Sequence, residues 1–262
     1  MEIRDTMIKL QKVLFFKRKN GKLLPQLYVI IVLCSVMAGC EAHFFNSGTQ
    51  ITQSKEVAPF RFLLIEDIFD LELIQADTFG VAITTGKELL NNIKLRSSGD
   101  SLFIKNNNSA RWSRRYEHPK IRVHFPDIEK ITLHEPCRMQ TIDTLKLDRF
   151  TLWAIAEVSE TQLCIKANYL RVVNASTSAG KYEVTGKVRT FSTWMRSSGI
   201  LEARHLEAEQ VTLRSQSIGD CYIWATKKLD VTIENSGYVY YMGAPEITLT
   251  NEQNENQLIP LE

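Results

Sequence analysis

Residues 191–224, FSTWMRSSGILEARHLEAEQVTLRSQSIGDCYIW, contain the pattern that decides the fold of this chain. A pair of core-type residues separated by one position starts at Phe191 and again, one repeat later, at Val211. Each pair is followed by a small polar corner that contains glycine, at residues 197–199 and 215–219. The stretch therefore holds two copies of one structural unit.

The same unit recurs through the second half of the chain. Its pairs are Ile131/Leu133, Phe150/Leu152, Leu170/Val172, Phe191/Thr193, Val211/Leu213, Val231/Ile233 and Ile247/Leu249. The first members of these pairs follow one another at nearly even steps, and only the last step is clearly shorter. Residues 176–180 and 235–237 repeat the glycine-containing corner. The corners lead into further apolar pairs: Tyr182/Val184, Leu201/Ala203, Tyr222/Trp224 and Val239/Tyr241.

A fixed period of about 20 residues with two or three short strands per repeat is typical of a β-solenoid. Each coil stacks on the next, so equivalent apolar positions form ladders inside, and glycine allows the chain to turn at the corners. The alternative is a β-sandwich, but turns there recur roughly every 8–12 residues. We therefore predict an all-β, right-handed β-solenoid, or β-helix-like, domain with repeats over about residues 129–250.

Strand signals also precede the repeats. Short segments alternate apolar and polar residues, which is typical of strands with one buried face; they are Leu71–Leu73, Val81–Ile83, Ile93–Leu95, Leu102–Ile104 and Ile121–Val123. Only residues 86–92 indicate a short helical turn. The sequence predicts a single all-β domain over residues 59–262, in which irregular β-strands come before the solenoid.

The N-terminal segment has the pattern of an export signal. Seven basic residues precede the apolar run Leu27–Met37, which is too short to cross a bilayer as a helix, since about 20 residues are needed. The run closes on Met37-Ala38-Gly39-Cys40, which resembles a bacterial lipobox. We predict a signal peptide over residues 1–40 and lipidation (palmitate) at Cys40, which anchors an outer-membrane lipoprotein of the cell envelope. A plain secretory signal or an uncleaved anchor is the alternative.

Removing the signal changes the charge balance. The whole chain carries 32 basic and 30 acidic residues, but residues 1–40 hold seven basic and two acidic ones. The remainder therefore has 25 basic and 28 acidic residues, a net charge of −3, which does not favour nucleic-acid binding. Residues 41–58 are polar without a sustained period, and we predict a flexible tether there.

The cysteines predict neither a disulfide framework nor a zinc site. Beyond Cys40 the chain has Cys137, Cys164 and Cys221, an odd number without a CxxC pair. We expect buried free thiols, with one disulfide and one leftover thiol as the alternative. The five histidines lack metal-ligand spacing, so we predict no metal and no cofactor.

Two segments resemble motifs of the auto-transporter adhesin head GIN domain family. Residues 236–245, SGYVYYMGAP, match a late unit of that family, Ser-Gly-x-Val-x-Tyr-x-Gly-x-Pro, and residues 125–131, FPDIEKI, match the proline-bearing start of its repeats. The resemblance covers roughly residues 60–250 and implies an exported all-β head domain. Residues 135–137 and 154–156 depart from it, since they lack the usual glycine and serine.

The sequence does not predict catalysis. Solenoid enzymes that act on polysaccharides need acids stacked from neighbouring coils. On a strict 20-residue lattice Glu160 shares its column with Gln140, Gly180, Ile200, Asp220 and Tyr240, which gathers no acid pair. GxSxG and HExxH motifs are also missing from the sequence. We predict a non-enzyme; a polysaccharide-acting β-helix enzyme and a purely structural periplasmic protein are the alternatives.

Aromatic and arginine residues are the candidates for binding. Aromatic rings recur from repeat to repeat and either pack inside or stack on sugar rings from an outer face. Residues 106–118 form an insertion in which arginines surround a tryptophan, a common composition of recognition sites. The candidates are Trp112, Arg114, Arg115, Trp194, Trp224 and Tyr240. We predict a non-catalytic envelope lipoprotein that presents an extended β surface for adhesion or for glycan or protein binding. The membrane face, periplasmic or cell surface, and the oligomeric state stay open.

Overall fold

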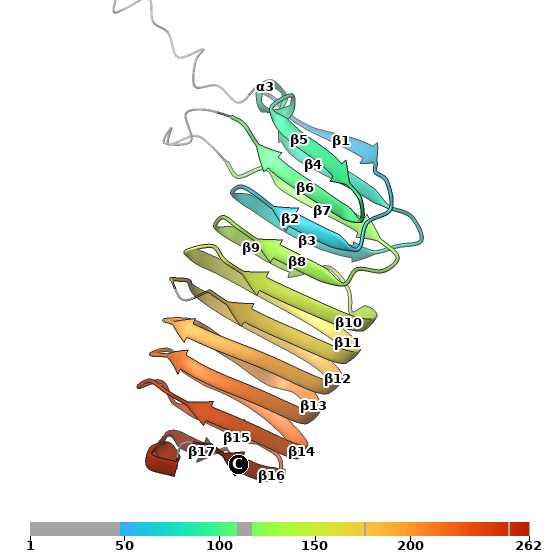
Figure 1. Cartoon of the computed structure of the whole chain (residues 1–262). Helices are drawn as coiled ribbons and strands as arrows, with labels where there is room; N and C mark the ends of the chain where they lie inside the picture. Colours follow the sequence, from blue (N-terminus) through green and yellow to red (C-terminus); the bar gives the residue numbers. More distant parts are fainter. Residues whose placement is uncertain (1–47, 109–116, 176, 251, 262) are drawn as a thin grey trace, which may run out of the picture. The chain divides into compact units, whose positions relative to one another are not determined.

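The computed structural model describes residues 48–108, 117–175, 177–250 and 252–261 (Figure 1). Their strands belong to one continuous hydrogen-bonded sheet that winds into stacked coils. The strands before the solenoid are β1 (Gln50–Glu56), β2 (Phe62–Ile65), β3 (Phe69–Gln75), β4 (Gly80–Gly86), β5 (Ile93–Ser98), β6 (Ser101–Asn106) and β7 (Lys120–Phe125). A one-turn helix, α3 (Lys87–Leu90), lies in the segment where the sequence indicates a helical turn.

The solenoid follows from β8 to the C-terminus. Its strands are β8 (Lys130–Leu133), β9 (Cys137–Thr141), β10 (Leu145–Ala154), β11 (Val158–Asn174), β12 (Ala179–Ser197), β13 (Ile200–Ser217), β14 (Cys221–Ile233), β15 (Val239–Met242), β16 (Glu246–Leu249) and β17 (Leu258–Pro260), with a 3-10 segment, η2 (Glu252–Gln257), before the last. The long strands β11 to β13 run around a corner of the coil without interruption, and their pairings with neighbouring coils are parallel. The predicted all-β solenoid is confirmed, and its repeat of about 20 residues is typical of this architecture.

The spacing between coils is not constant. In the early coils Cys137 pairs with Ser159, an offset above 20, whereas in the late coils Glu207 pairs with Trp224, an offset below 20. Irregular positions in β13 shorten the later coils. Val211 therefore stacks on Leu229, and not on Val231 as an even 20-residue repeat predicts.

The core consists of ladders of inward-facing apolar residues. Phe150, Leu170, Phe191, Val211 and Leu229 are register partners in turn, and each is at most 1% exposed. Burial of such side chains stabilises the stack by about 1.5–3 kcal/mol each. Ile247 continues the column but is 39% exposed, because its coil is the last in this column.

The Ser/Gly corners are tight stacking points. The Ser217 hydroxyl donates to the Gly199 carbonyl at 2.8 Å and accepts from the Gly219 amide at 3.0 Å. A Cβ on Gly237 would lie 2.3 Å from the Gly219 carbonyl oxygen, so only glycine lets these coils approach. The repeated corner sequence is therefore explained by backbone packing.

Two sequence predictions are wrong in detail. Tyr222 and Trp224 do not face inward, because Leu201 pairs with Cys221, and Cys221 and Ile223 fill the core instead. A slip of one residue exchanges the two faces of a strand. The predicted tether over residues 41–58 also includes β1, which pairs with β4 along its whole length, so the folded part begins before residue 59.

The N-terminal strands stack in an order that differs from the chain. β2 lies between β6 and β8, and β3 lies between β7 and β9, so the coil of β2 and β3 sits between the coil of β6 and β7 and that of β8 and β9. β4 pairs antiparallel with both β7 and β1 (Figure 1). Irregular strands thus precede the repeats, as the sequence predicts, and they cover the first coil.

Candidate functional site

Four aromatic residues lie on the outer side of β14 and β15 and at the position just before β15, and we call them the aromatic face: Tyr222, Trp224, Tyr240 and, before β15, Tyr238. Cys221, Ile223 and Val239 are fully buried and point into the core, so their neighbours along each strand point outward. The alternation that buries the ladders therefore also places these rings on the surface.

Two of the rings form a stack. Tyr222 and Tyr240 are parallel register partners, and their ring centroids lie 4.7 Å apart with an angle of 8° between the planes. This distance equals the usual separation of neighbouring strands, about 4.7–4.9 Å. Tyr238, which is 43% exposed, lies 6.2 Å from Tyr240 in a tilted arrangement.

An arginine closes one end of the stack. The Arg204 guanidinium lies 4.1 Å from the centre of the Tyr222 ring, and it pairs with the Glu202 carboxylate at 3.0 Å. Cation–π contacts of this kind stabilise by about 0.5–1 kcal/mol at exposed sites. Arg204, Tyr222 and Tyr240 thus form a row across β13, β14 and β15.

The Tyr240 hydroxyl remains a hydrogen-bond donor at neutral pH. Partial burial, followed by the charge of Asp220 and the neighbouring tyrosines, raises the pKa of Tyr240 above its ordinary value of 10. The Asp220 carboxylate itself accepts a bond from the Tyr238 amide at 2.9 Å. Flat apolar rings with polar edges suit the stacking of sugar rings, and this surface offers both.

The structure separates the predicted binding residues. Trp224 and Tyr240 lie on the aromatic face, but Trp194 belongs to a different column, where its partners are Val173 and Arg214. Arg196 lies 3.2 Å from the centre of the Trp194 ring, and Arg214 lies 4.8 Å from it. The indole nitrogen donates to Gln216 at 3.0 Å. Trp194 is thus enclosed by contacts within the protein.

Four further predicted residues, Trp112, Arg114, Arg115 and the lipidation residue Cys40, lie outside the described residues. The binding and lipidation roles assigned to them therefore stay predictions.

The column of Glu160 differs from the one predicted on an even lattice. Its register partners are Arg138 and Lys181, in place of Gln140 and Gly180, because these coils are slightly longer than the lattice. The register instead brings together two acids that the lattice missed, Glu183 and Glu202. Glu202 is ion-paired with Arg204. Three hollows in the described surface, of about 520, 480 and 290 Å³, are lined by other residues.

The described cysteines are free thiols. Cys137 and Cys221 are buried, and Cys164 is half-buried. Within the described ranges, no group of three or more His, Cys, Asp or Glu side chains is arranged to hold a metal ion. A helix with the length and apolar character to cross a membrane is likewise not found in the part of the chain that the structure describes.

Comparison with known proteins gives one family. The family model described as "Putative auto-transporter adhesin, head GIN domain" matches residues 59–245. The match supports a non-catalytic, adhesion-type role. A comparison with curated proteins finds no match.

Solved structures with a similar fold come from Bacteroides and Parabacteroides species. A "putative adhesin" of Bacteroides fragilis is 19% identical with a TM-score of 0.70, and the match covers 81% of this chain and 95% of that one. A "putative lipid binding protein" of Parabacteroides distasonis is 17% identical with a TM-score of 0.59, over 81% and 94%. A "putative adhesin" of Parabacteroides merdae is 13% identical with a TM-score of 0.55, over 81% and 94%. At these identities the likeness concerns the fold.

Sequence reasoning missed Arg204 and Tyr222 as surface residues. The signal for Tyr222 was present, since Tyr240 follows it at almost one period, but a strict period of 20 places these two residues in different columns. Only the shortened offset of the last coils brings them together.

Proposed function

Because the chain belongs to the auto-transporter adhesin head GIN domain family, we propose that it is an exported, non-catalytic lipoprotein that binds glycan through the aromatic face. The observation that carries this proposal is the stack of Tyr222 and Tyr240, capped by Arg204. Binding proceeds by contact with an open surface and without a bond-breaking step.

The chemistry of the row supports a carbohydrate ligand. A sugar ring presents axial C–H groups to an aromatic face and hydroxyl groups around its rim. The half-buried rings of Tyr222 and Tyr240 provide the apolar area, while the phenol hydroxyls and the Glu202 carboxylate provide polar partners at its edge. Trp224, outward on the same strand as Tyr222, extends the apolar surface.

The arrangement of acids supports a role without catalysis. Glycoside hydrolysis needs two carboxyl groups on either side of the scissile bond, one of them held protonated. Glu183 and Glu202 lie side by side in one column on one face of the sheet, and Arg204 neutralises Glu202. Both acids therefore lie on the same side of any ligand on this surface, and the pair leaves no partner on the opposite side of a substrate.

The predicted export signal supports an envelope location. Lipid at Cys40 would anchor the chain in the membrane, with the β domain extending from it. Cell fractionation tests this: the Cys40→Ser variant is expected to move from the membrane to the soluble fraction, and retention in the membrane contradicts the anchor. Protease treatment of intact cells then distinguishes the cell surface from the periplasmic face.

A glycan array tests the binding site. The wild-type chain and the Tyr222→Ala/Tyr240→Ala variant are compared on immobilised glycans. Since an aromatic contact contributes about 0.5–1.5 kcal/mol, losing both rings is expected to weaken binding roughly five- to a hundredfold. Tyr169→Ala is the matched control, because Tyr169 is also a half-buried surface ring with an arginine, Arg149, 4.8 Å from its centre. Wild-type levels of binding by the double variant, or no glycan bound by the wild type, would overturn the proposal.

A further inference from the structure

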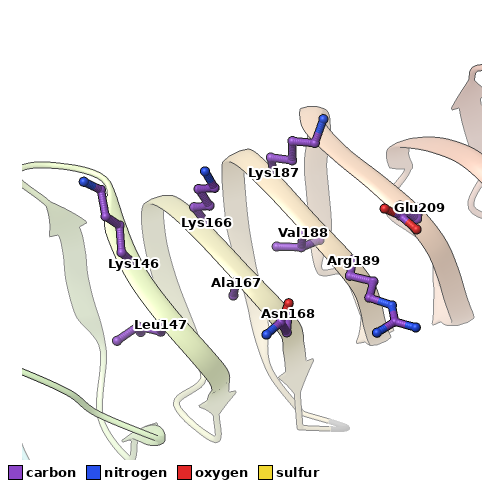
Figure 2. Close-up of a pocket in the computed structure, with 9 residues that line it drawn as sticks. All are labelled: Lys146, Leu147, Lys166, Ala167, Asn168, Lys187, Val188, Arg189 and Glu209. Carbon is purple, nitrogen blue, oxygen red and sulfur yellow. The ribbon is translucent and has the colours of Figure 1, made fainter.

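A second surface lies on the side of the solenoid formed by the first part of β10 and the middle of β11 and β12. Lys146, Lys166 and Lys187 are register partners on three successive coils, and we call them the lysine row. They line a hollow of about 520 Å³ (Figure 2). In the figure their side chains extend along one rim, while Asn168 and Arg189 extend on the other.

The floor between the two rims is apolar. It consists of Leu147, Ala167 and Val188, which are register partners and are between 2% and 9% exposed. Strands in a sheet are about 4.7–4.9 Å apart, so the lysine row repeats one positive charge at that interval. The hollow is thus a short groove with cationic and amide groups above an apolar base.

The charges of the row are incompletely balanced. Lys187 pairs with Glu207 at 2.7 Å, but the ammonium groups of Lys146 and Lys166 have no hydrogen bond or ion pair with any other described residue. At the far end Glu209 pairs with Lys227 at 2.7 Å. Asn168 donates to Asp148 at 2.6 Å, which holds its amide at the rim.

Like charges at directly opposed positions of a sheet are destabilising. A different column of the same solenoid avoids such repetition, since Glu160 lies between Arg138 and Lys181 there. The lysine row places three positive charges in succession although residues 41–262 carry a net charge of −3. The charges of Lys146 and Lys166 have no acidic partner among the described residues, so the row is open to a ligand that neutralises them.

We propose that the lysine row binds a linear acidic polysaccharide that lies along the solenoid axis. In a polyuronate the carboxylates follow one another at about the length of one sugar unit, which is close to the separation of the coils. The carboxylates that face the solenoid pair with the row, above all with Lys146 and Lys166, while Arg189 and Asn168 contact hydroxyl groups from the opposite rim. The apolar floor accommodates the faces of the sugar rings.

Binding of polygalacturonate to the full-length protein tests this proposal. The dissociation constant is measured at several NaCl concentrations for the wild type and for Lys146→Gln/Lys166→Gln, which removes the two lysines of the row that have no acidic partner in the described part of the chain. Two lysines near a polyanion account for roughly ten- to thirtyfold in affinity, so we expect a loss of that size. The slope of log affinity against log salt is expected to fall by about 1.4, since each lysine contact with a single-stranded polyanion contributes about 0.7 to it.

Three comparisons make the result specific. The Lys105→Gln/Lys181→Gln variant has the same change in charge at two exposed lysines elsewhere and is expected to bind like the wild type. Tyr222→Ala/Tyr240→Ala is also expected to bind normally, so failure here is distinguishable from failure of the aromatic face. Single-stranded DNA is the competing polyanion. The proposal would be overturned if the variant in the lysine row and the Lys105→Gln/Lys181→Gln variant lost affinity equally. It would also be overturned if the wild type did not bind polygalacturonate at low salt, or if it bound single-stranded DNA more tightly.

Discussion

Tyr222 and Tyr240 are register partners on the last coils of the solenoid, and their rings lie parallel with centroids 4.7 Å apart. The separation of the strands sets the separation of the rings, because both residues leave the sheet in the same direction. The backbone thereby builds a flat surface from two side chains that belong to different coils.

The hydroxyl and the ring of Tyr240 are expected to contribute separately to glycan binding. Tyr240→Phe keeps the stack on Tyr222 but removes the hydroxyl, so binding should weaken by about 0.5–1.5 kcal/mol. Tyr240→Ala removes both and should weaken it further. Titration of the glycan selected on the array measures the two losses, and equal losses in both variants would contradict the contribution of the ring.

Gly237 is expected to be required for stability because of its close approach to the previous corner. A Cβ there would lie 2.3 Å from the Gly219 carbonyl oxygen and 2.7 Å from that of Ser217. Gly237→Ala should destabilise by about 1–3 kcal/mol and lower Tm by about 3–10 °C. Gly80→Ala is the control, since a Cβ added at Gly80 would lie 3.6 Å from its nearest neighbour, the Lys55 carbonyl oxygen. Thermal unfolding with an unchanged Tm for Gly237→Ala would contradict this packing.

The three described thiols are expected to differ in reactivity. Burial raises the pKa of both Cys137 and Cys221 to about 12, so their thiolates are scarce at pH 8, while Cys164 is half-buried. In a chain with Cys34→Ser and Cys40→Ser, maleimide at pH 8 should label Cys164 in the native state and the other two only after unfolding. Mass spectrometry of the peptides measures this. Native-state labelling of Cys137 or Cys221 would contradict their burial.

Glu72 is expected to give the N-terminal coils a pH-dependent stability. The carboxylate is 5% exposed and accepts from Arg122 at 2.6 Å and from Lys120 at 3.2 Å. Burial alone would raise the pKa of Glu72, but the hydrogen bonds and charges of these two cations outweigh it and leave the pKa below 4.5. The stabilisation is therefore complete above pH 4.5 and is lost as pH falls through the lowered pKa of the folded state.

The Glu72→Gln variant measures this contribution. At pH 7 it should be less stable by about 1–3 kcal/mol, because Arg122 and Lys120 lose their charged partner. The difference from the wild type, measured by urea unfolding, should shrink as pH falls below 4.5. The exposed Glu160, which pairs with Arg138 at 3.1 Å, is the control, since Glu160→Gln should change stability by about 0–1 kcal/mol. A difference that is the same at pH 7 and at pH 3 would contradict the role of the Glu72 charge.

The sequence predicts the solenoid because its period depends on local features, namely core pairs such as Phe191/Thr193 and glycine corners such as Gly199. It does not predict the register. The core residue Leu201 pairs with Cys221, so Tyr222 points outward although the apolar pattern Tyr222/Trp224 places it inside, and the shorter offset of the last coils pairs it with Tyr240. A shift of the pairing register by one residue hardly changes the period of the sequence, but it decides which residues reach the surface.

Unlike the aromatic face, the lysine row follows from the period of the sequence. Lys146, Lys166 and Lys187 recur at almost even steps of one repeat, so the period alone aligns them. Testing columns of basic residues as well as columns of acids would have found this row. The position of β2 and β3 between later strands was not predictable in that way, because it depends on pairing between segments that are distant in the chain.

The central claim, that a glycan covers the aromatic face, is tested most directly by hydroxyl-radical footprinting of the wild-type chain with and without the glycan selected on the array. The measured quantity is the oxidised fraction of each tyrosine. We expect the glycan to lower the oxidation of Tyr222 and Tyr240 and to leave Tyr169 unchanged. Unchanged oxidation of Tyr222 and Tyr240 at a saturating glycan concentration would contradict the account.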